Sequence, residues 1–380
     1  IILISARAFK RLITVVGLIT TYLCSYYIGM VFLDRPAEDP GELYDREVEL
    51  RRLRSSALSR AITLVVGFRR VGKTSLVKAA TKGMTRVYID ARRFEGMGYI
   101  TVKDFLNEFA KSLSQLLPLS RRLAEFLGRV RGVSIMGLSI EFSGQTRELS
   151  VPSILDALND WASSEGRHLV IIIDEVQELG KMRGYSLLPT FAYAYDNLRN
   201  VSFVFAGSKV GMLYNYLRLN DPDSPLYGRY MEVIELRPFT REQSMDFLRR
   251  GFSEAGVEVS DDMIGRAVDE LDGVVGWLSM FGLTYISNPS PEALDRTIGI
   301  ASGIVEEEFC NFVRAMGSRR YVLVVNALKH GATWSEVKRY LELREGRAIS
   351  DSEVTKLLRK LMDNGFIMKV NNQYVIVDPI

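Results

Sequence analysis

The feature that most constrains this chain is the stretch "VVGFRRVGKTSLVKAA" at Val65–Ala80. Gly67 is followed by four residues and then by Gly-Lys-Thr at 72–74, which is the spacing of a phosphate-binding P-loop. A short apolar segment, Ile62–Val66, precedes the loop, and a segment with helical spacing follows it. Between a buried strand and a helix N-terminus, such a loop aims backbone N–H groups and the helix dipole at an anion. The motif therefore predicts an α/β fold that binds a nucleotide.

Further segments with the composition of strands alternate with helical stretches along the chain. They are Arg86–Asp90, His168–Glu175, Val201–Gly207 and Met231–Leu236. This alternation implies a mostly parallel sheet with helices on both faces, and a separate hairpin is expected at Val133–Phe142. Beyond Pro238 the pattern becomes helical.

An acidic pair ends the strand that we expect at His168–Glu175. We expect Lys73 to reach the β- and γ-phosphates of ATP, and the Thr74 hydroxyl to bind Mg²⁺. Asp174 would hold the same Mg²⁺ through water, and Glu175 would polarise the attacking water as a general base. Acidic residues at strand ends are often only solvated turn residues, but the combination with a P-loop favours a magnesium-dependent ATPase.

The residues expected to surround the phosphates are consecutive in the loop: Gly67, Phe68, Arg69, Arg70, Val71, Gly72, Lys73, Thr74 and Ser75. Arg69 and Arg70 have three open roles, as contacts to phosphate, to a partner or to solvent alone. Gln177 and Glu178 follow the acidic pair, and they either couple the nucleotide state to the next helix or begin a solvated helix.

Five segments in this order resemble the archaeal ATPase family, an AAA+-related group within the STAND-type P-loop ATPases: "GFRRVGKTSL", "IIIDEVQEL", "VFAGS", "SPLYGR" and "LRPF". The resemblance implies the fold class of a P-loop NTPase: an AAA+-like parallel sheet, a helical lid and a C-terminal winged helix. Its parts would be an apolar N-terminal segment at 1–33, an ATPase core at 34–238, a lid at 239–317 and a winged helix-turn-helix at 318–380.

The resemblance also implies roles for residues outside the P-loop. Arg46, in the segment "YDREVEL", would lie near the adenine. Ser208 stands at the sensor-1 position, where it would contact the γ-phosphate or the water; a simple helix N-cap is the alternative. Arg229 stands where AAA+ proteins place an arginine finger, in cis or from a neighbour in a homo-oligomer, with a salt bridge as the alternative. In the lid motif Val275 replaces the usual proline, and Trp277 is expected in the core rather than against the adenine.

The last part of the chain has three helical segments and then a hairpin with Asn371-Asn372 at its turn, which is the winged helix-turn-helix layout. Residues 318–380 carry 11 Lys/Arg against 7 Asp/Glu, whereas residues 1–317 carry 38 against 39. This local positive charge favours contact with double-stranded DNA, although winged helices also serve as protein-interaction or autoinhibitory modules. The candidate DNA contacts are Lys356, Arg359 and Lys360 in the third helix and Lys369 in the wing.

The run Leu12–Leu33 has 22 uncharged residues, enough to span a bilayer. It is either an anchor for an ATPase that faces the cytosol or sequence outside the functional protein, since members of the resembling family begin near Met30. We favour the second interpretation and a cytoplasmic location. Only two cysteines and two histidines are present, which excludes a disulfide framework, a cysteine zinc site and a multi-histidine metal centre.

Together these features predict a magnesium-dependent ATPase that works as a slow switch, in which the nucleotide sets the angle between core, lid and winged helix. Two alternatives remain: a DNA-binding regulator whose nucleotide is never hydrolysed, and a membrane-tethered signalling ATPase. The expected partners are ATP or ADP, double-stranded DNA, and a second copy of the chain or another protein.

Overall fold

The computed structural model describes residues 31–142 and 150–380. At its centre five strands form a parallel sheet, in the order β2 (Thr85–Asp90), β5 (Leu169–Asp174), β6 (Val201–Gly207), β1 (Ile62–Val66) and β7 (Glu232–Glu235). The predicted strands agree with these bounds to within one residue at either end. Parallel pairing places the loops that follow β1, β5 and β6 at the same edge of the sheet, where a ligand can meet all three.

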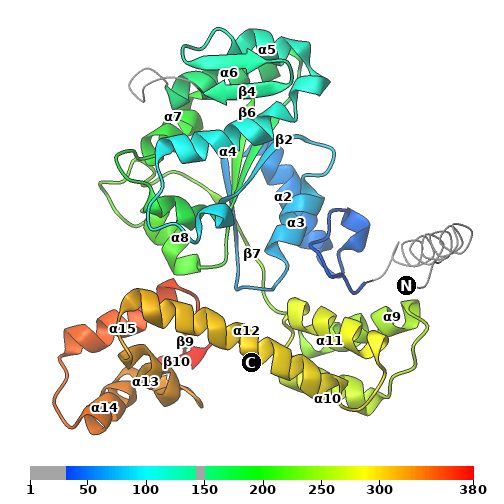
Figure 1. Ribbon diagram of the computed structural model, residues 1–380, viewed down its shortest axis with the longest axis vertical. Helices are drawn as coiled ribbons and strands as arrows, with labels where there is room; N and C mark the ends of the chain where they lie inside the picture. Colours follow the sequence, from blue (N-terminus) through cyan, green and yellow to red (C-terminus); the bar gives the residue numbers. More distant parts are fainter. Residues whose placement is uncertain (1–30, 143–149) are drawn as a thin grey trace, which may run out of the picture.

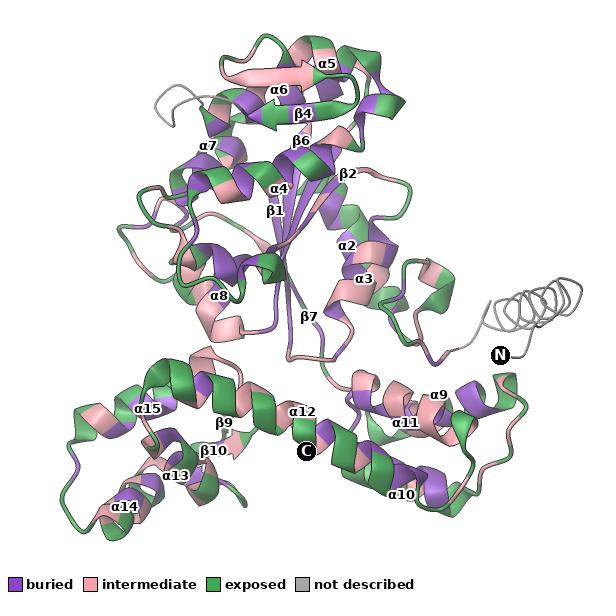
Figure 2. Ribbon diagram, viewed as in Figure 1, coloured by how far each residue is buried: buried purple, intermediate pink, exposed green. Residues whose placement is uncertain are grey.

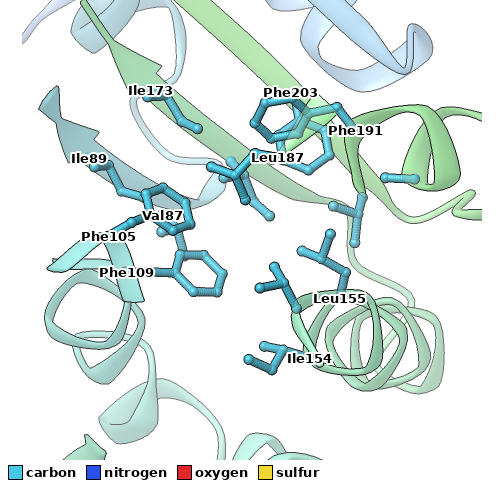
Figure 3. Packing of buried hydrophobic residues seen from close by; sticks show 14 of the residues in the cluster. Val87, Ile89, Phe105, Phe109, Ile154, Leu155, Ile173, Leu187, Phe191 and Phe203 are labelled. Carbon is cyan, nitrogen blue, oxygen red and sulfur yellow. The ribbon is translucent and has the colours of Figure 1, made fainter. Parts of the chain in front are cut away.

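The helices around the sheet are α2 (Glu47–Ser59), α3 (Lys73–Ala80), α4 (Val102–Ser114), α5 (Arg121–Leu127), α6 (Val151–Ser164), α7 (Leu188–Asn197) and α8 (Val210–Leu217). They cover both faces because successive side chains of a strand point in opposite directions. In β5, Ile171 and Ile173 pack with α4 to α8, whereas Val170 and Ile172 pack with α2 and α3. Figure 2 shows the central strands β1 and β6 as buried, and Figure 3 shows the larger of the two clusters. The predicted hairpin is present as β3 (Val133–Met136) and β4 (Ser139–Phe142).

The lid consists of α9 (Arg241–Glu254), α10 (Asp261–Leu271), α11 (Val275–Ser287) and the first part of α12 (Ala293–Met316). Phe32 is fully buried among the aromatic side chains of this unit. A Cβ atom on Gly251 or Gly282 would come within 2.5 Å of the Phe32 ring, so both helices need glycine at this contact. The boundary predicted at residue 33 therefore divides a segment that packs as part of the lid.

The winged helix contains α13 (Arg320–Ala327), α14 (Trp334–Glu345) and α15 (Asp351–Asp363), with a sheet in the order β8 (Ala332–Thr333), β10 (Gln373–Ile376) and β9 (Ile367–Val370). Asn371 and Asn372 both have positive φ angles, 46° and 71°, as a two-residue type I′ turn requires. Strand β8 is an addition to the predicted elements, because two residues show no recognisable period.

Figure 1 shows the core above, the lid and winged helix below it, and α12 running between the lid and the winged helix. Phe309 and Phe312 of α12 pack with the winged helix, so the boundary predicted at residue 317 lies past the first residues of that unit.

The run Leu12–Leu33 lies outside the described residues except for its last three. Among the helices within residues 31–142 and 150–380, none is long and apolar enough to cross a membrane.

Candidate nucleotide-binding site

The P-loop connects β1 to α3 in a conformation that depends on its glycines. Gly72 immediately precedes α3 and has a φ of 92°, a left-handed angle that side chains rarely adopt. A Cβ atom on Gly67 would lie 2.5 Å from the carbonyl oxygen of Leu236. Arg70, between the two glycines, also has a positive φ, 66°. The first backbone N–H groups of α3 are thereby directed at the space beyond the sheet edge.

A cavity of about 690 Å³ opens at this edge between the core and the lid. The P-loop lines it together with Glu175 and Ser208 from the core, while Val275 and Gly276 of α11 line it from the lid. Its size is typical of a small-molecule site, and many of the side chains that line it are charged.

At the phosphate end of the cavity, Lys73, Thr74 and Asp174 come together as the sequence predicts. The Thr74 hydroxyl donates to Asp174 Oδ2 at 2.8 Å, and the Lys73 ammonium donates to the Phe68 carbonyl within the loop. Burial lowers the pKa of Lys73 to about 8, although Glu175 and Asp174 oppose the change. Burial also raises the pKa of Asp174, and the charge of Glu175 adds to the rise. For both groups, burial outweighs the stabilisation of the charged form by neighbouring groups.

These donors fit the magnesium complex of a nucleotide. Thr74 and Asp174 offer oxygen ligands only, and Mg²⁺ typically takes one or two protein oxygens and completes its shell with phosphates and water. The described residues contain no group of three or more His, Cys, Asp or Glu side chains that is placed to hold a metal ion. The residues thus suit an ion that arrives with the nucleotide.

Glu175 follows β5 with a φ of 53°, and its carboxylate is held through a single oxygen. Oε2 accepts hydrogen bonds from the Ser208 N–H at 3.0 Å, the Ser208 hydroxyl at 2.8 Å and Gln177 Nε2 at 2.5 Å. Oε1 accepts none from the described part of the chain, which leaves it available to a water molecule. Ser208 therefore acts here as an anchor for Glu175, and it does not cap α8, whose N-cap residue is Lys209.

Gln177 and Glu178 are buried, each with an exposed fraction of 2%. Their interpretation as the start of a solvated helix is therefore wrong. Glu178 forms ion pairs with Lys209 at 3.0 Å and with Lys181 at 2.7 Å, and Lys209 directly follows the anchor Ser208. This arrangement ties the turn η4 (Val176–Lys181) to the segment that begins α8.

The other end of the cavity is lined by Tyr44, Arg46 and Phe239. The buried Arg46 guanidinium donates to the Arg237 carbonyl at 2.6 Å and lies 4.6 Å from the centre of the Phe239 ring. The contacts of Arg46 thus hold the wall of the cavity in place. The aromatic side chains at this end offer the apolar surface that a nucleotide base would need.

The two P-loop arginines contact the lid and the segment after the wing. Both make ion pairs with Glu308 of α12, and Arg70 also pairs with Asp378. Trp277 is buried, with an exposed fraction of 1%, and Arg70 lies 4.3 Å from the centre of its ring. Trp277 therefore packs in the lid core, as expected, and its outer face supports the P-loop.

Arg229 lies away from the lining of this cavity. It forms an ion pair with Asp196 at 2.6 Å and donates to the Pro225 carbonyl. The sequence left two interpretations open for Arg229, an arginine finger or a salt bridge, and the salt bridge is present within the chain. An arginine finger supplied to a neighbouring copy remains a prediction.

The predicted DNA contacts are exposed side chains of the winged helix. Lys356, Arg359 and Lys360 are exposed on α15, and within the described residues none of the three has a carboxylate partner. Lys369 is exposed on β9 and lies 5.6 Å from the centre of the Tyr374 ring.

Sequence patterns did not point to three contributors to the site. Tyr88 donates to Asp174 Oδ2 at 2.8 Å, Lys209 lines the cavity, and Glu308 binds both P-loop arginines. The sequence does contain a signal for Tyr88. Side chains alternate along a strand, and Tyr88 is paired with Ile172 of β5, so both side chains lie on the face of the sheet that packs with α2 and α3. Lys209 and Glu308 have no local signal, since both act through residues distant in sequence.

Comparison with known proteins agrees with this geometry. Residues 43–281 match a family described as an ATPase domain predominantly from Archaea, and residues 316–377 match the C-terminal winged helix-turn-helix domain of MCM proteins. The protein MJECL04 of Methanocaldococcus jannaschii is 24% identical over 332 residues, which are 85% of this chain but 61% of that protein. The chain thus spans less than two thirds of this relative's length.

Among solved structures, the Walker-type ATPase PABY2304 of Pyrococcus abyssi is 32% identical, with a TM-score of 0.78 over 92% of this chain and 98% of that one. The ORC2 protein of Aeropyrum pernix, solved with ADPNP and ADP, shares the fold at 15% identity, with a TM-score of 0.55 over 92% and 93% of the two chains. The family match over more than half of the chain and the likeness to PABY2304 show that this protein belongs to the P-loop ATPase family found predominantly in Archaea, with a winged helix-turn-helix after the ATPase domain.

Proposed function

We propose that this protein binds ATP with Mg²⁺ in the cavity between core and lid, hydrolyses it slowly, and uses the nucleotide state to position the winged helix. The observation that carries the proposal is that Lys73, Thr74 and Glu175 line one cavity that the lid also lines, and that the buried Asp174 accepts a hydrogen bond from Thr74. Each of these side chains is one that phosphoryl transfer to water requires.

The chain's own residues would share the work as follows. The Lys73 ammonium leaves the Phe68 carbonyl and binds the terminal phosphates, while the P-loop N–H groups hold the remaining oxygens. Thr74 and Asp174 would hold Mg²⁺, which would neutralise charge on the phosphates. Glu175 accepts a proton from the attacking water at Oε1, since its Oε2 is already engaged by Ser208 and Gln177.

Contacts between the winged helix and the core support the switch. The turn after α15 lies against the segment that begins α8, because a Cβ atom on Gly365 would lie 3.3 Å from the Ser208 carbonyl oxygen. A Cβ atom on Gly211 would lie 2.7 Å from the backbone of Asp363. The winged helix therefore contacts the same segment that anchors the general base, and a change at either place has a direct path to the other.

Phosphate release and nucleotide binding test the proposal together. Glu175→Gln should retain ATP binding and lose hydrolysis by about a hundredfold or more. Lys73→Ala should weaken ATP binding by at least about tenfold, whereas Lys82→Ala, which changes an exposed residue just after the same helix, should change neither. Wild-type protein that releases no phosphate, with or without DNA, would exclude the enzyme. Identical small-angle scattering of the ATP- and ADP-bound forms would exclude the switch.

A second function is association with double-stranded DNA. It is supported by the unpaired cations of α15, since guanidinium and ammonium groups without carboxylate partners remain available to backbone phosphates. In a regulator of this kind the nucleotide would only stabilise the fold, and the wild-type protein would bind ATP without turnover.

A further inference from the structure

The P-loop carries two arginines that together hold one carboxylate of the lid. Arg69 Nη1 donates to Glu308 Oε2 at 2.5 Å, and Arg70 Nη2 donates to Glu308 Oε1 at 2.5 Å. The three side chains are 18% to 31% exposed, so water screens their attraction only in part. Glu308 belongs to α12, the helix that runs from the lid to the winged helix.

A second carboxylate reaches Arg70 from beyond the wing. Asp378 Oδ2 lies 3.4 Å from Arg70 Nη1, and Asp378 Oδ1 accepts a hydrogen bond from Trp277 Nε1 at 3.0 Å. Ile380, two residues further on, packs against the lid cluster. The segment after β10 is thereby attached to the P-loop and to the lid at once.

The backbone of Arg70 is under strain that these contacts maintain. Its φ of 66° is uncommon for a residue other than glycine. The Gly276 N–H at the start of α11 donates to the Arg70 carbonyl at 2.9 Å, and a Cβ atom on Gly276 would lie only 2.9 Å from the Arg70 Cβ. The lid therefore holds Arg70 by its backbone while Glu308 and Asp378 hold its guanidinium.

The negative charges of Glu308 and Asp378 oppose the positive charges of Arg69 and Arg70. Glu308 and both arginines line the same cavity as Lys73. The phosphates of a nucleotide bound there would therefore bring additional negative charge close to the two arginines. Guanidinium groups bind phosphate oxygens strongly and in a bidentate manner. A polyphosphate on the P-loop would thus compete with Glu308 and Asp378 for Arg69 and Arg70.

We propose that Arg69, Arg70, Glu308 and Asp378 form an ionic latch that attaches the segment after the wing to the P-loop, and that nucleotide binding opens it. The inference rests on the proposed function, because it names the contact through which the nucleotide controls the winged helix. Since binding and latch opening are coupled, any change that weakens the latch strengthens nucleotide binding.

The test uses the full chain and the non-hydrolysable analogue ADPNP with Mg²⁺, so that it does not depend on turnover. Asp378→Asn and Glu308→Gln should each bind ADPNP about fivefold more tightly than wild type, measured by calorimetry. Asp351→Asn, which removes an ion pair with Lys338 elsewhere in the winged helix, and Glu307→Gln, next to Glu308 and exposed, are the controls and should bind like wild type. Nucleotide-free Asp378→Asn should also scatter X-rays like nucleotide-bound wild type.

Unchanged or weaker ADPNP binding by both latch variants would overturn the latch. Unchanged binding would mean that the nucleotide leaves the contacts intact, and weaker binding would mean that the carboxylates orient the arginines toward it. Wild-type protein that binds no ADPNP would instead refute the proposed function. If wild type binds ADPNP and rearranges, and the latch variants behave identically to wild type, the latch alone would be refuted.

Discussion

At the scale of single residues, Gln177 is placed where its side chain serves the general base. Its Nε2 donates to Glu175 Oε2, while its own Oε1 is buried without a partner in the described structure. An unsatisfied buried oxygen costs about 1–3 kcal/mol. We infer that this cost is tolerated because the Nε2 group of the same amide orients Glu175, together with Ser208.

Replacing Gln177 by leucine should therefore affect the rate more than the binding of ATP. We expect kcat to fall by about tenfold to a hundredfold, since a misplaced catalytic group costs that much, while the Kd for ATP stays within about twofold of wild type. Steady-state phosphate release and equilibrium binding measure the two effects. Gln115→Leu, at the exposed end of α4, is the control. A Gln177→Leu protein with wild-type kcat would show that Ser208 holds Glu175 unaided.

His168 gives the fold a dependence on pH. Its Nε2 lies 3.0 Å from Ser202 Oγ, which itself donates to the Ala57 carbonyl, so the imidazole is the donor of that pair. Burial lowers the pKa of His168 in the folded protein. The unfolded chain therefore takes up the proton first as the pH falls through about 6.5, and stability is lost below that pH.

Urea unfolding at pH 7.5 and pH 5.5 measures the contribution of His168. From pH 7.5 to pH 5.5, the urea concentration at the unfolding midpoint should decrease more for wild type than for His168→Gln. The glutamine amide can still donate to Ser202 but does not titrate in this range. His330→Gln, which alters an exposed side chain, should behave like wild type. An equal fall for wild type and His168→Gln would assign the pH dependence to other groups.

At the scale of elements, the contact between α8 and α15 joins two units that are far apart in sequence. Gly211, in the first turn of α8, faces the backbone of Asp363 at the end of α15. Helices generally prefer alanine to glycine, by roughly 1 kcal/mol. The close approach of the two elements therefore explains why glycine is found here in spite of its low helix propensity.

Two glycine-to-alanine changes separate propensity from packing. Gly299→Ala, in an open part of α12, should stabilise the protein by about 1 kcal/mol, because nothing lies within 4 Å of the new methyl group. Gly211→Ala should destabilise the docked arrangement by about 1–3 kcal/mol, because its methyl group meets backbone at 2.7 Å. Denaturant unfolding gives both values, and hydrogen exchange should rise in α15 for Gly211→Ala only. Equal stability of the two variants would mean that α15 does not press on α8 in solution.

At the scale of the whole molecule, the nucleotide cavity lies where three units meet. The core supplies the P-loop and Glu175, the lid supplies α11, and α12 adds Glu308 and Asn311 to the wall before it enters the winged helix. A single helix thus contacts both the site and the module that would contact DNA. Movement of the lid is therefore expected to move the winged helix with it.

Binding to double-stranded DNA can be measured as a function of salt. If α15 contacts phosphates, replacing Lys356, Arg359 and Lys360 by alanine should reduce the slope of log K against log salt by about 2.7, close to 0.9 for each lost contact. The same change of charge at Lys103, Arg121 and Arg122, on exposed parts of the core, should leave the slope unchanged. A slope that responds equally to both sets would indicate non-specific attraction by net charge rather than a binding surface on α15.

Much of the fold and the centre of the site could be predicted from local patterns. The strands, the P-loop and the acidic pair depend on the order of residues over short stretches, and the resemblance to the archaeal ATPases was confirmed by the family match. The turn at Asn371-Asn372 is local in the same sense, since backbone geometry within a few residues decides it.

The tertiary structure decided the partners of these groups. Arg70 and Asp378 are separated by 308 positions and Arg69 and Glu308 by 239, so no spacing along the chain announces either pair. Phe32 enters the lid core, and Gln177 turns inward to Glu175, for the same reason: each depends on surfaces that exist only after distant elements have packed. Short-range sequence determined that a nucleotide's phosphates can be held at Gly67 to Thr74, and long-range packing determined which parts of the molecule are in contact with that loop.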